Sequence, residues 1–435
     1  MYCNVLKLLL VEELYPAIAA GFDYNISDSE KGITIKMNGF NEKLPLLLMT
    51  IAKYMVNYST LVTKDLFEIV KVQQLKTYYN TFIKPGKLVR DVRLWILKLI
   101  YYTHVDTHTA LRDINFEEFQ DFVKSFTNHL YLQCLVQGNM TQDTVIETIQ
   151  QCMKIINYGP LLPNTIPQMR VIQIPLGTCY CKLKNINKID VNSVITNYYQ
   201  AGITSIELLV LIDLLIMIME EPLFNQLRTQ EQLGYDVSCV LRDINGILGY
   251  SITIHTQADK YTTEYIDQRI EEFLKSFNKI LEEFPEEELN DVKDTLRKLK
   301  QSADIDLEEE VNRNWTEIIR CEYMFDRLER EVLAIEDIKI KKLREWAAEH
   351  TLNGNNFRKL SVHVVGTDSK KSIVTEANKD RKKTQEKYFF LEYITDDPQY
   401  KEMQNYYITN IEDYKKDLYV YPVSEGANPL GAFIK

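Results

Sequence analysis

Residues 220–235 read EEPLFNQLRTQEQLGY and form the most informative stretch of the chain. The pattern predicts the end of one helix, a second helix that begins at Pro222, and a step through Gly234 and Tyr235 into a strand. Two interpretations of the polar residues remain open. Either Arg228 forms a local ion pair and Tyr235 packs at the strand start, or both side chains point toward a shared cavity. In the second case, guanidinium and phenol would donate hydrogen bonds to a peptide carbonyl or a tetrahedral oxyanion.

The segments around this stretch alternate between helical and strand-like periodicity. An apolar helix is predicted over residues 205–219, two strands over 235–241 and 247–255, and a last strand over 360–365. The strand at Cys179-Tyr-Cys181 would place both thiols on one face. Further helices are predicted over residues 262–283, 286–300, 308–330 and 335–349.

An earlier block of the chain follows a similar order. It contains a helix over residues 5–20, two short strands at 24–26 and 32–37, several helices, and a buried strand over 130–136. Each block ends with helices and then a strand that runs into a glycine, Gly138 or Gly366, 366 − 138 = 228 residues apart. The sequence therefore predicts an α+β protein of two homologous domains, each a mainly antiparallel sheet packed with helices, the first incomplete at its start.

Three prolines at 160, 163 and 167 mark the predicted linker between these domains. The predicted divisions are residues 1–165, residues 166–368, and a charged excursion with a C-terminal tail over 369–435. Residues 369–404 are rich in Lys, Glu and Asp, which predicts a flexible segment. The end of the tail, from residue 408, carries enough Tyr, Val and Pro to pack back on the body.

Composition narrows the classes of partner. The chain has 435 residues with 51 Lys and Arg against 62 Asp and Glu, a formal charge of −11. This acidic balance argues against nucleic-acid binding and is compatible with basic peptide partners. Seven scattered cysteines suit a reducing compartment, so the expected location is cytoplasmic. No apolar run is long enough for a membrane span or a signal peptide, and the N-terminus resembles a helix already under way, as in a fragment.

No self-contained catalytic or metal site is recognisable. Among six histidines only His104 and His108 have a four-residue spacing, and Val105 and Thr107 stand where a zinc-peptidase motif would need glutamate. This pair is interpreted as a solvated helix end rather than as a metal site. Motifs for serine hydrolases, phosphate-binding loops and dinucleotide binding are also absent from the sequence. We therefore expect no metal ligand and no cofactor in this chain.

The stretch F-x-x-L-R-T-[KQ]-x-x-L-G-Y, here Phe224 to Tyr235, resembles the fourth-domain signature of the pitrilysin/insulinase family of zinc metallopeptidases. Residues 245–254, 256–261, 270–277, 309–315, 325–328 and 360–366 resemble the nardilysin-like branch more than the insulin-degrading branch. Residues 39–48 and 83–93 resemble the third domain. The resemblance covers about residues 5–366.

The resemblance implies a clamshell of four α+β domains that encloses a peptide chamber. It places zinc and an H-x-x-E-H helix in the first half, whereas the second half contributes an arginine and a tyrosine that match Arg228 and Tyr235. The chain would then be a non-catalytic C-terminal half that walls the chamber and orients peptide substrates. Its partner would be the N-terminal half or a full-length homologue, with a homodimer as another assembly. The alternative is a peptide-binding or scaffold protein derived from a truncated peptidase gene.

Overall fold

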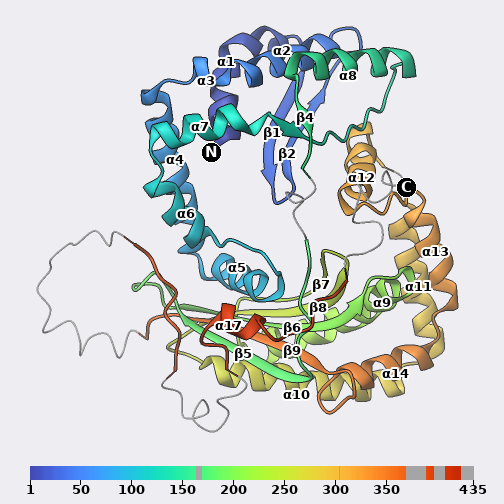
Figure 1. Ribbon diagram of the computed structural model, residues 1–435. Coiled ribbons are helices and arrows are strands. Elements are labelled where there is room, and N and C mark those ends of the chain that lie inside the picture. Colours follow the sequence, from blue (N-terminus) through green and yellow to red (C-terminus); the bar gives the residue numbers. More distant parts are fainter. Residues whose placement is uncertain (163–168, 303, 369–387, 396–406, 423–435) are drawn as a thin grey trace, which may run out of the picture. The chain divides into compact units, whose positions relative to one another are not determined.

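The computed structural model describes all residues except 163–168, 303, 369–387, 396–406 and 423–435. The chain divides into two compact units (Figure 1). Unit 1 comprises residues 1–79, 106–168 and 304–318, and unit 2 comprises residues 80–105, 169–303 and 319–435. The predicted α+β class is confirmed, while the predicted domain limits stay predictions.

Unit 2 is built on a five-stranded sheet in the order β5-β9-β6-β8-β7. Strands β5 and β9 are parallel, and every other neighbouring pair is antiparallel. The central strand β6 pairs with β9 on one side and with β8 on the other. The elements of unit 2 are α5 (Pro85–Leu97), β5 (Gly177–Lys184), β6 (Asn192–Ile203), α9 (Ile206–Leu223), η2 (Phe224–Gln230), β7 (Asp236–Ile244), β8 (Ile247–Gln257), α10 (Thr263–Glu283), α11 (Glu286–Gln301), α13 (Arg327–Asp337), α14 (Ile340–His350), β9 (Arg358–Val365) and α17 (Ile411–Lys415).

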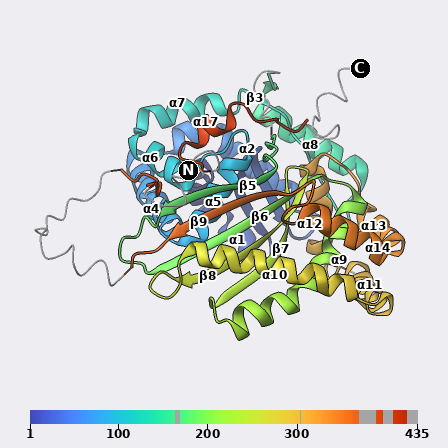
Figure 2. The ribbon, with the colours of Figure 1, turned by 90° about the horizontal axis from the view of Figure 1, so that it is seen from below.

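Two apolar layers cover the two faces of this sheet. On one face, α9 and α10 bury Ile195, Leu248 and Ile254 against residues such as Phe273 and Phe277. Figure 2 looks toward the side on which α10 crosses the sheet. On the other face, α5 and the chain around α17 cover a cluster that includes Cys179, Cys181, Leu360, Val362, Ile408, Ile411 and Tyr421. The two thiols therefore share one face, and described parts of the C-terminal tail pack on the sheet. Most of the predicted excursion at 369–404 lies outside the described residues.

Unit 1 is mainly helical. Its elements are α1 (Tyr2–Ala19), β1 (Asp23–Ser29), β2 (Gly32–Asn38), α2 (Leu44–Val56), α3 (Tyr58–Leu61), α7 (Phe116–Phe126), β3 (His129–Leu130), α8 (Gln142–Ile156) and β4 (Gly159–Pro160), with most of α4 (Lys64–Phe82), α6 (His104–Asp113) and α12 (Leu307–Arg320). One face of α1 buries Leu6, Leu10 and Leu14 in a core that also holds Phe67 and Phe119. Gly21 follows α1 with φ +89°, a conformation that glycine adopts without steric cost.

The two units repeat one succession of elements. In unit 1, α1 is followed by Gly21-Phe-Asp23, the hairpin β1–β2 and α2. In unit 2, α9 and η2 are followed by Gly234-Tyr-Asp236, the hairpin β7–β8 and α10. The two Gly-aromatic-Asp steps are 234 − 21 = 213 residues apart, and each leads directly into the first strand of its hairpin. By this comparison β2 corresponds to β8.

The predicted strand over residues 130–136 is wrong for most of its length. Only His129 and Leu130 are in a strand, through a two-residue parallel pairing of β3 with β4. In unit 2 the corresponding strand β9 reaches β8 only through β6, which lies between them. Among the described residues of unit 1, no strand lies beside β2 except β1. An apolar segment cannot form a sheet without a neighbour that accepts its backbone hydrogen bonds.

This difference predicts unequal hydrogen exchange in two segments of similar sequence character. Backbone amides of residues 134–136 should exchange at least ~100-fold faster than those of residues 360–364 in β9, because only the latter sit in a ladder inside a sheet. Hydrogen–deuterium exchange read by mass spectrometry on the purified chain measures both segments in one experiment. Equal protection would show that residues 130–136 are paired in solution.

Candidate functional site

The stretch that carries the sequence prediction lies at the end of α9. Ser205 caps this helix by accepting a hydrogen bond from the Leu208 N–H at 3.1 Å. The predicted break at Pro222 is wrong, because α9 continues through Pro222 to Leu223 and passes directly into the π-helix η2. Proline removes an N–H and crowds the preceding turn, and a widened turn is a common way to accommodate such an irregularity.

A tight turn over residues 231–235, the exit of η2, then connects this helix to β7. The Leu233 N–H returns to the Leu227 carbonyl at 3.0 Å, and Gln232 adopts a left-handed conformation with φ +53°. A Cβ on Gly234 would stand 2.1 Å from the carbonyl oxygen of His255, so only glycine fits between η2 and β8. The Tyr235 N–H then donates to this same carbonyl at 3.2 Å.

An ion pair anchors the exit to α10. Arg269 donates from Nη2 to Oε1 of Glu231 at 2.6 Å and from Nε to Oε2 at 2.7 Å. These hydrogen bonds lower the pKa of Glu231 below its ordinary value, although partial burial opposes the shift. Gln226 donates to the same carboxylate at 3.0 Å. A two-point arginine–carboxylate contact fixes orientation as well as distance, so η2 is held at a defined angle to α10.

The structure brings the two predicted site residues together. The Arg228 guanidinium carbon lies 4.8 Å from the ring centroid of Phe224 and 5.9 Å from that of Tyr235. This is cation–π geometry, and no ion pair of Arg228 is found within the described ranges. Tyr235 is 87% exposed, so its phenol is available to a ligand rather than packed at the strand start. The role of the pair in orienting a substrate stays a prediction.

Comparisons with known proteins show to which family the chain belongs. Residues 1–110 match the model described as the middle or third domain of peptidase M16, and residues 214–315 match the C-terminal lobe domain 4 of PqqF-like PQQ synthase. Human nardilysin is 40% identical over 367 residues, which cover 84% of this chain and 32% of nardilysin. The chain belongs to the M16 peptidase family, in its nardilysin-like branch. Human insulin-degrading enzyme is 28% identical over 378 residues, covering 85% of this chain and 36% of the enzyme.

A solved structure supports the same fold. Pitrilysin superposes with a TM-score of 0.77 at 15% identity, covering 97% of this chain and 41% of the pitrilysin chain. At this level of identity the likeness concerns the fold alone. The chain spans about a third of the length of the curated relatives it matches.

The described histidines do not fit a zinc site of the kind this family implies. His104 Nδ1 contacts Asp91 Oδ2 at 2.5 Å, and the backbone N–H of His104 donates to the same oxygen at 2.9 Å. His108 is buried, and burial lowers its pKa, followed by the nearby charge of Arg112. Within the described ranges no group of three or more His, Cys, Asp or Glu side chains is arranged to hold a metal ion. Likewise, no helix in the described part is long and apolar enough to cross a membrane.

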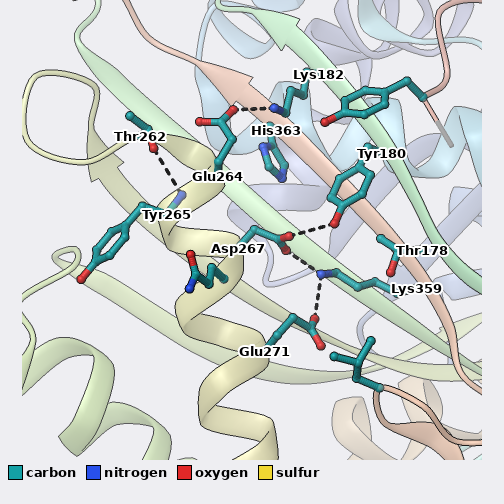
Figure 3. Close-up of a pocket in the computed structure, with 13 residues that line it drawn as sticks. Thr178, Tyr180, Lys182, Thr262, Glu264, Tyr265, Asp267, Glu271, Lys359 and His363 are labelled. Atoms are coloured by element: carbon teal, nitrogen blue, oxygen red, sulfur yellow. Dashed lines mark hydrogen bonds and ion pairs between the residues drawn. The ribbon is translucent and has the colours of Figure 1, made fainter. Parts of the chain in front are cut away.

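Sequence reasoning missed a second polar site, a pocket of about 530 Å³ between β5, β9 and α10 (Figure 3). Its inner wall holds Lys359, which is 1% exposed and contacts Asp267 Oδ1 at 2.6 Å and Glu271 Oε1 at 2.7 Å. Lys182 pairs with Glu264 at the same wall. The signal was present in the sequence: Lys359, Ser361 and His363 alternate with apolar residues along β9. Strand periodicity predicts only a last strand over residues 360–365 and assigns these polar side chains no role.

The charges in this pocket support one another. Burial alone would raise the pKa of Asp267, but Lys359 and its hydrogen bonds hold that pKa below its ordinary value. Burial would lower the pKa of Lys359, but Asp267 and Glu271 raise it. Removing one partner would leave a buried charge uncompensated, at a cost of about 3–5 kcal/mol. The network therefore fixes α10 on the sheet at one position.

His363 is fully buried beside this network and is neutral near pH 7. Burial lowers its pKa to about 4, although Asp267 favours the protonated ring. The Ser361 hydroxyl donates to Asn197 Oδ1 at 2.6 Å, so its oxygen accepts a hydrogen bond from His363 Nε2 at 2.7 Å. This assigns the proton to Nε2 of the neutral ring.

The depressed pKa of His363 predicts a pH dependence of stability. An unfolded histidine takes up its proton near pH 6.5, whereas the folded ring does so near pH 4, so the unfolded state binds more protons in between. The free energy of unfolding of unit 2 should therefore fall as pH drops from 6.5 toward 4, by on the order of 2–3 kcal/mol from this residue. Urea unfolding at a series of pH values measures the slope.

His363→Gln should flatten this slope between pH 6.5 and 4.5, because glutamine does not titrate. The same slope in the wild type and in His363→Gln would show that His363 is already protonated at pH 6 in the folded protein.

Proposed function

We propose that this chain acts as the non-catalytic C-terminal half of a nardilysin-like zinc metalloendopeptidase, in which it lines the peptide chamber and orients substrate through Arg228 and Tyr235. The observation that carries the proposal is the pair of an exposed Tyr235 and a half-buried Arg228, held together at the exit of η2. Its guanidinium lies 5.9 Å from the phenol ring. A π-helix, a glycine with no room for a side chain and a two-point ion pair all serve to present two side chains that do little for the core.

The chemistry of the pair suits polarised peptide carbonyls. Guanidinium and phenol both donate hydrogen bonds, and such donors lower the barrier to acyl transfer when they contact the oxygen on which negative charge develops. The described residues provide no fitting zinc ligands, so the metal and the glutamate that activates water would come from an N-terminal half, in the same polypeptide or a partner. Acidic charge favours basic peptides as substrates. The seven cysteines, which form no disulfide bonds in the described part of the chain, suit a reducing, cytoplasmic setting.

The second candidate is a peptide-binding or scaffold protein that works without any catalytic half, alone or as a homodimer. It is favoured by the same pair of donors, which could hold a peptide without cleaving it. Cleavage after supply of a catalytic half separates the two functions, because a scaffold would bind peptide and leave it intact.

The first experiment measures metal and activity. The purified chain should contain less than ~0.1 equivalent of tightly bound zinc by elemental analysis and should not cleave a dibasic fluorogenic peptide, because the described histidines do not fit a zinc site. Addition of a separately produced N-terminal half of human nardilysin should yield chelator-sensitive cleavage. One equivalent of zinc with activity in the chain alone would contradict the proposal.

The second experiment concerns Tyr235. In the reconstituted enzyme, Tyr235→Phe should lower kcat on the order of 100-fold, the effect of removing one transition-state donor. The free energy of unfolding should change by less than about 0.5 kcal/mol, since the side chain is exposed. Tyr419→Phe removes another exposed phenol of unit 2 and should alter neither quantity. An unchanged kcat for Tyr235→Phe would remove Tyr235 from the site.

A further inference from the structure

Unit 2 contains a buried arginine without a counter-charge. Arg93 lies in the second half of α5, on the side that faces the sheet, and only 4% of it is exposed. Its guanidinium carbon stands 5.9 Å from the ring centroid of Tyr198 in β6. Its Nε has no hydrogen-bond partner, and no ion pair of Arg93 is found among the residues that the structure describes. Arginine is almost never buried in this way unless it is paired.

A second arginine approaches the same place from the edge of the sheet. Arg242 lies in β7 opposite Gly249 of β8, and its Nε donates to the Ser251 hydroxyl at 2.8 Å. Tyr198 is opposite Ser251 on the other side of β8. Side chains two positions apart in a strand share a face, so Arg242 and Tyr198 lie on the face that α5 covers.

These positive charges repel one another. Burial lowers the pKa of Arg93 to about 10, and the charge of Arg242 acts in the same direction. Arg90, which is exposed one helical turn earlier in α5, adds a smaller effect of the same sign. The three guanidiniums are therefore gathered at a cost that no contact within the described part of the chain offsets.

The glycine opposite Arg242 brings a further donor to this place. A Cβ on Gly249 would stand 2.9 Å from the Tyr198 hydroxyl, so the phenol lies directly over β8. This hydroxyl is buried and has no hydrogen-bond partner of normal geometry. Burial raises the pKa of the phenol, while Arg93 and the Gln200 amide oppose the shift. That amide is itself bonded to the backbone before β5. The Arg93 Nε–H and the Tyr198 hydroxyl are thus two unused donors.

The carboxylates that neighbour these arginines in sequence are bound elsewhere. Asp91 of α5 accepts a hydrogen bond from the Tyr101 hydroxyl at 2.9 Å. Asp243 of β7 faces the other side of the sheet, where its carboxylate contacts Arg320 at 2.9 Å. Neither acid compensates the buried guanidinium.

A planar carboxylate fits this set of donors. Guanidinium donates two parallel hydrogen bonds to a carboxylate or a phosphate. Phosphate sites commonly draw on backbone N–H groups at a helix N-terminus or in a glycine-rich loop. Here Arg90 and Arg93 lie beyond the first turn of α5 and the backbone of Arg242 belongs to the β7–β8 ladder, so side chains alone are offered. The formal charge of −11 also repels a multiply charged anion more than a singly charged one.

We propose that Arg93 and Arg242, with Arg90 at the rim and Tyr198 as a further donor, form a binding site for the terminal carboxylate of a peptide. The ligand's identity as a peptide rests on the proposed function, whereas its chemical class rests on the arginines. A bound carboxylate supplies the charge that Arg93 lacks and accepts its unused N–H. The site is separate from the Arg228–Tyr235 pair, which lies at the opposite end of β7.

The test follows binding to the full chain, with arginine labelled by a stable nitrogen isotope. The Arg93 Nε–H resonance, assigned by its loss in Arg93→Met, reports the site without any need for peptidase activity. Acetyl-triglycine with a free terminal carboxylate should shift this resonance, and its terminal amide should bind at least ~10-fold more weakly. Inorganic phosphate and the diamide of acetyl-aspartic acid should also bind at least ~10-fold more weakly.

Each probe can overturn the inference. Equal affinity for the acid and the amide would remove the carboxylate from the contact, and tighter binding of phosphate would replace it by another anion. Tighter binding of the aspartic acid diamide would assign the site to acidic side chains and not to the peptide terminus. Carboxylate binding without cleavage in the reconstituted enzyme would contradict the proposed function and leave this site standing, whereas cleavage without binding would do the reverse.

Substitutions in the chain make the test specific to these arginines. Arg93→Met and Arg242→Gln should each weaken binding of acetyl-triglycine at least ~10-fold, because each removes one charged donor. Arg93→Met should not lower the thermal midpoint of the free chain, since it removes an uncompensated buried charge and keeps an apolar stem. Arg330→Met is the matched control, because it removes an exposed arginine of α13, and it should leave the affinity within about twofold. Equal affinity of Arg242→Gln and the wild type would overturn the inference.

A lower thermal midpoint of the ligand-free Arg93→Met variant would show that Arg93 already has a partner in the protein, and would also overturn it.

Discussion

The pairing of one central strand on both of its edges decides how much sheet each unit contains. In unit 2, β6 joins β9 to β8 and so connects the parallel pair β5–β9 to the hairpin β7–β8. In unit 1, the same succession of helix, glycine step, hairpin and helix has no such strand in its described part, and the sheet stops at two strands. In a buried sheet every backbone N–H and C=O group needs a hydrogen-bond partner, and side-chain packing cannot take the place of that partner. The apolar stretch at 131–136 consequently remains exposed despite a sequence that favours strand.

The Arg228–Tyr235 site depends on the same sheet. Tyr235 reaches its position because Gly234 passes against the carbonyl of His255, and His255 is fixed by the pairing of β8 with β7 and β6. The π-turns of η2 shift the helix end relative to a regular α-helix, and Glu231 ties that end to Arg269 of α10. These features place an exposed phenol beside a half-buried guanidinium at a rigid end of the fold. This arrangement is typical of a functional site built on a scaffold and not of a packing solution.

The polar pocket shows a different use of charge. Lys359, Asp267 and Glu271 are buried together, although apolar side chains of similar volume would often contribute as much stability. Such a network tolerates only one register between α10 and β9, because any shift would leave a buried charge unpaired. It therefore locks the helix that in turn holds Glu231 and η2. The pocket and the candidate site are connected through α10 in this mechanical sense.

The sequence by itself determined the α+β class, the family, the position of most helices in unit 2 and the identity of Arg228 and Tyr235 as the residues to examine. Periodicity and a local motif suffice for these, because each depends on neighbours within a few residues along the chain. Tertiary structure alone decided that α9 runs through Pro222, that residues 131–136 do not form a strand and that Lys359 and His363 line a buried polar pocket. The missing strand at residues 131–136 and the buried polar pocket each depend on partners distant in sequence: a neighbouring strand that accepts backbone hydrogen bonds, or carboxylates on α10. Local propensity cannot specify such partners. They are specified by the physical requirement that buried donors, acceptors and charges find partners in the folded protein.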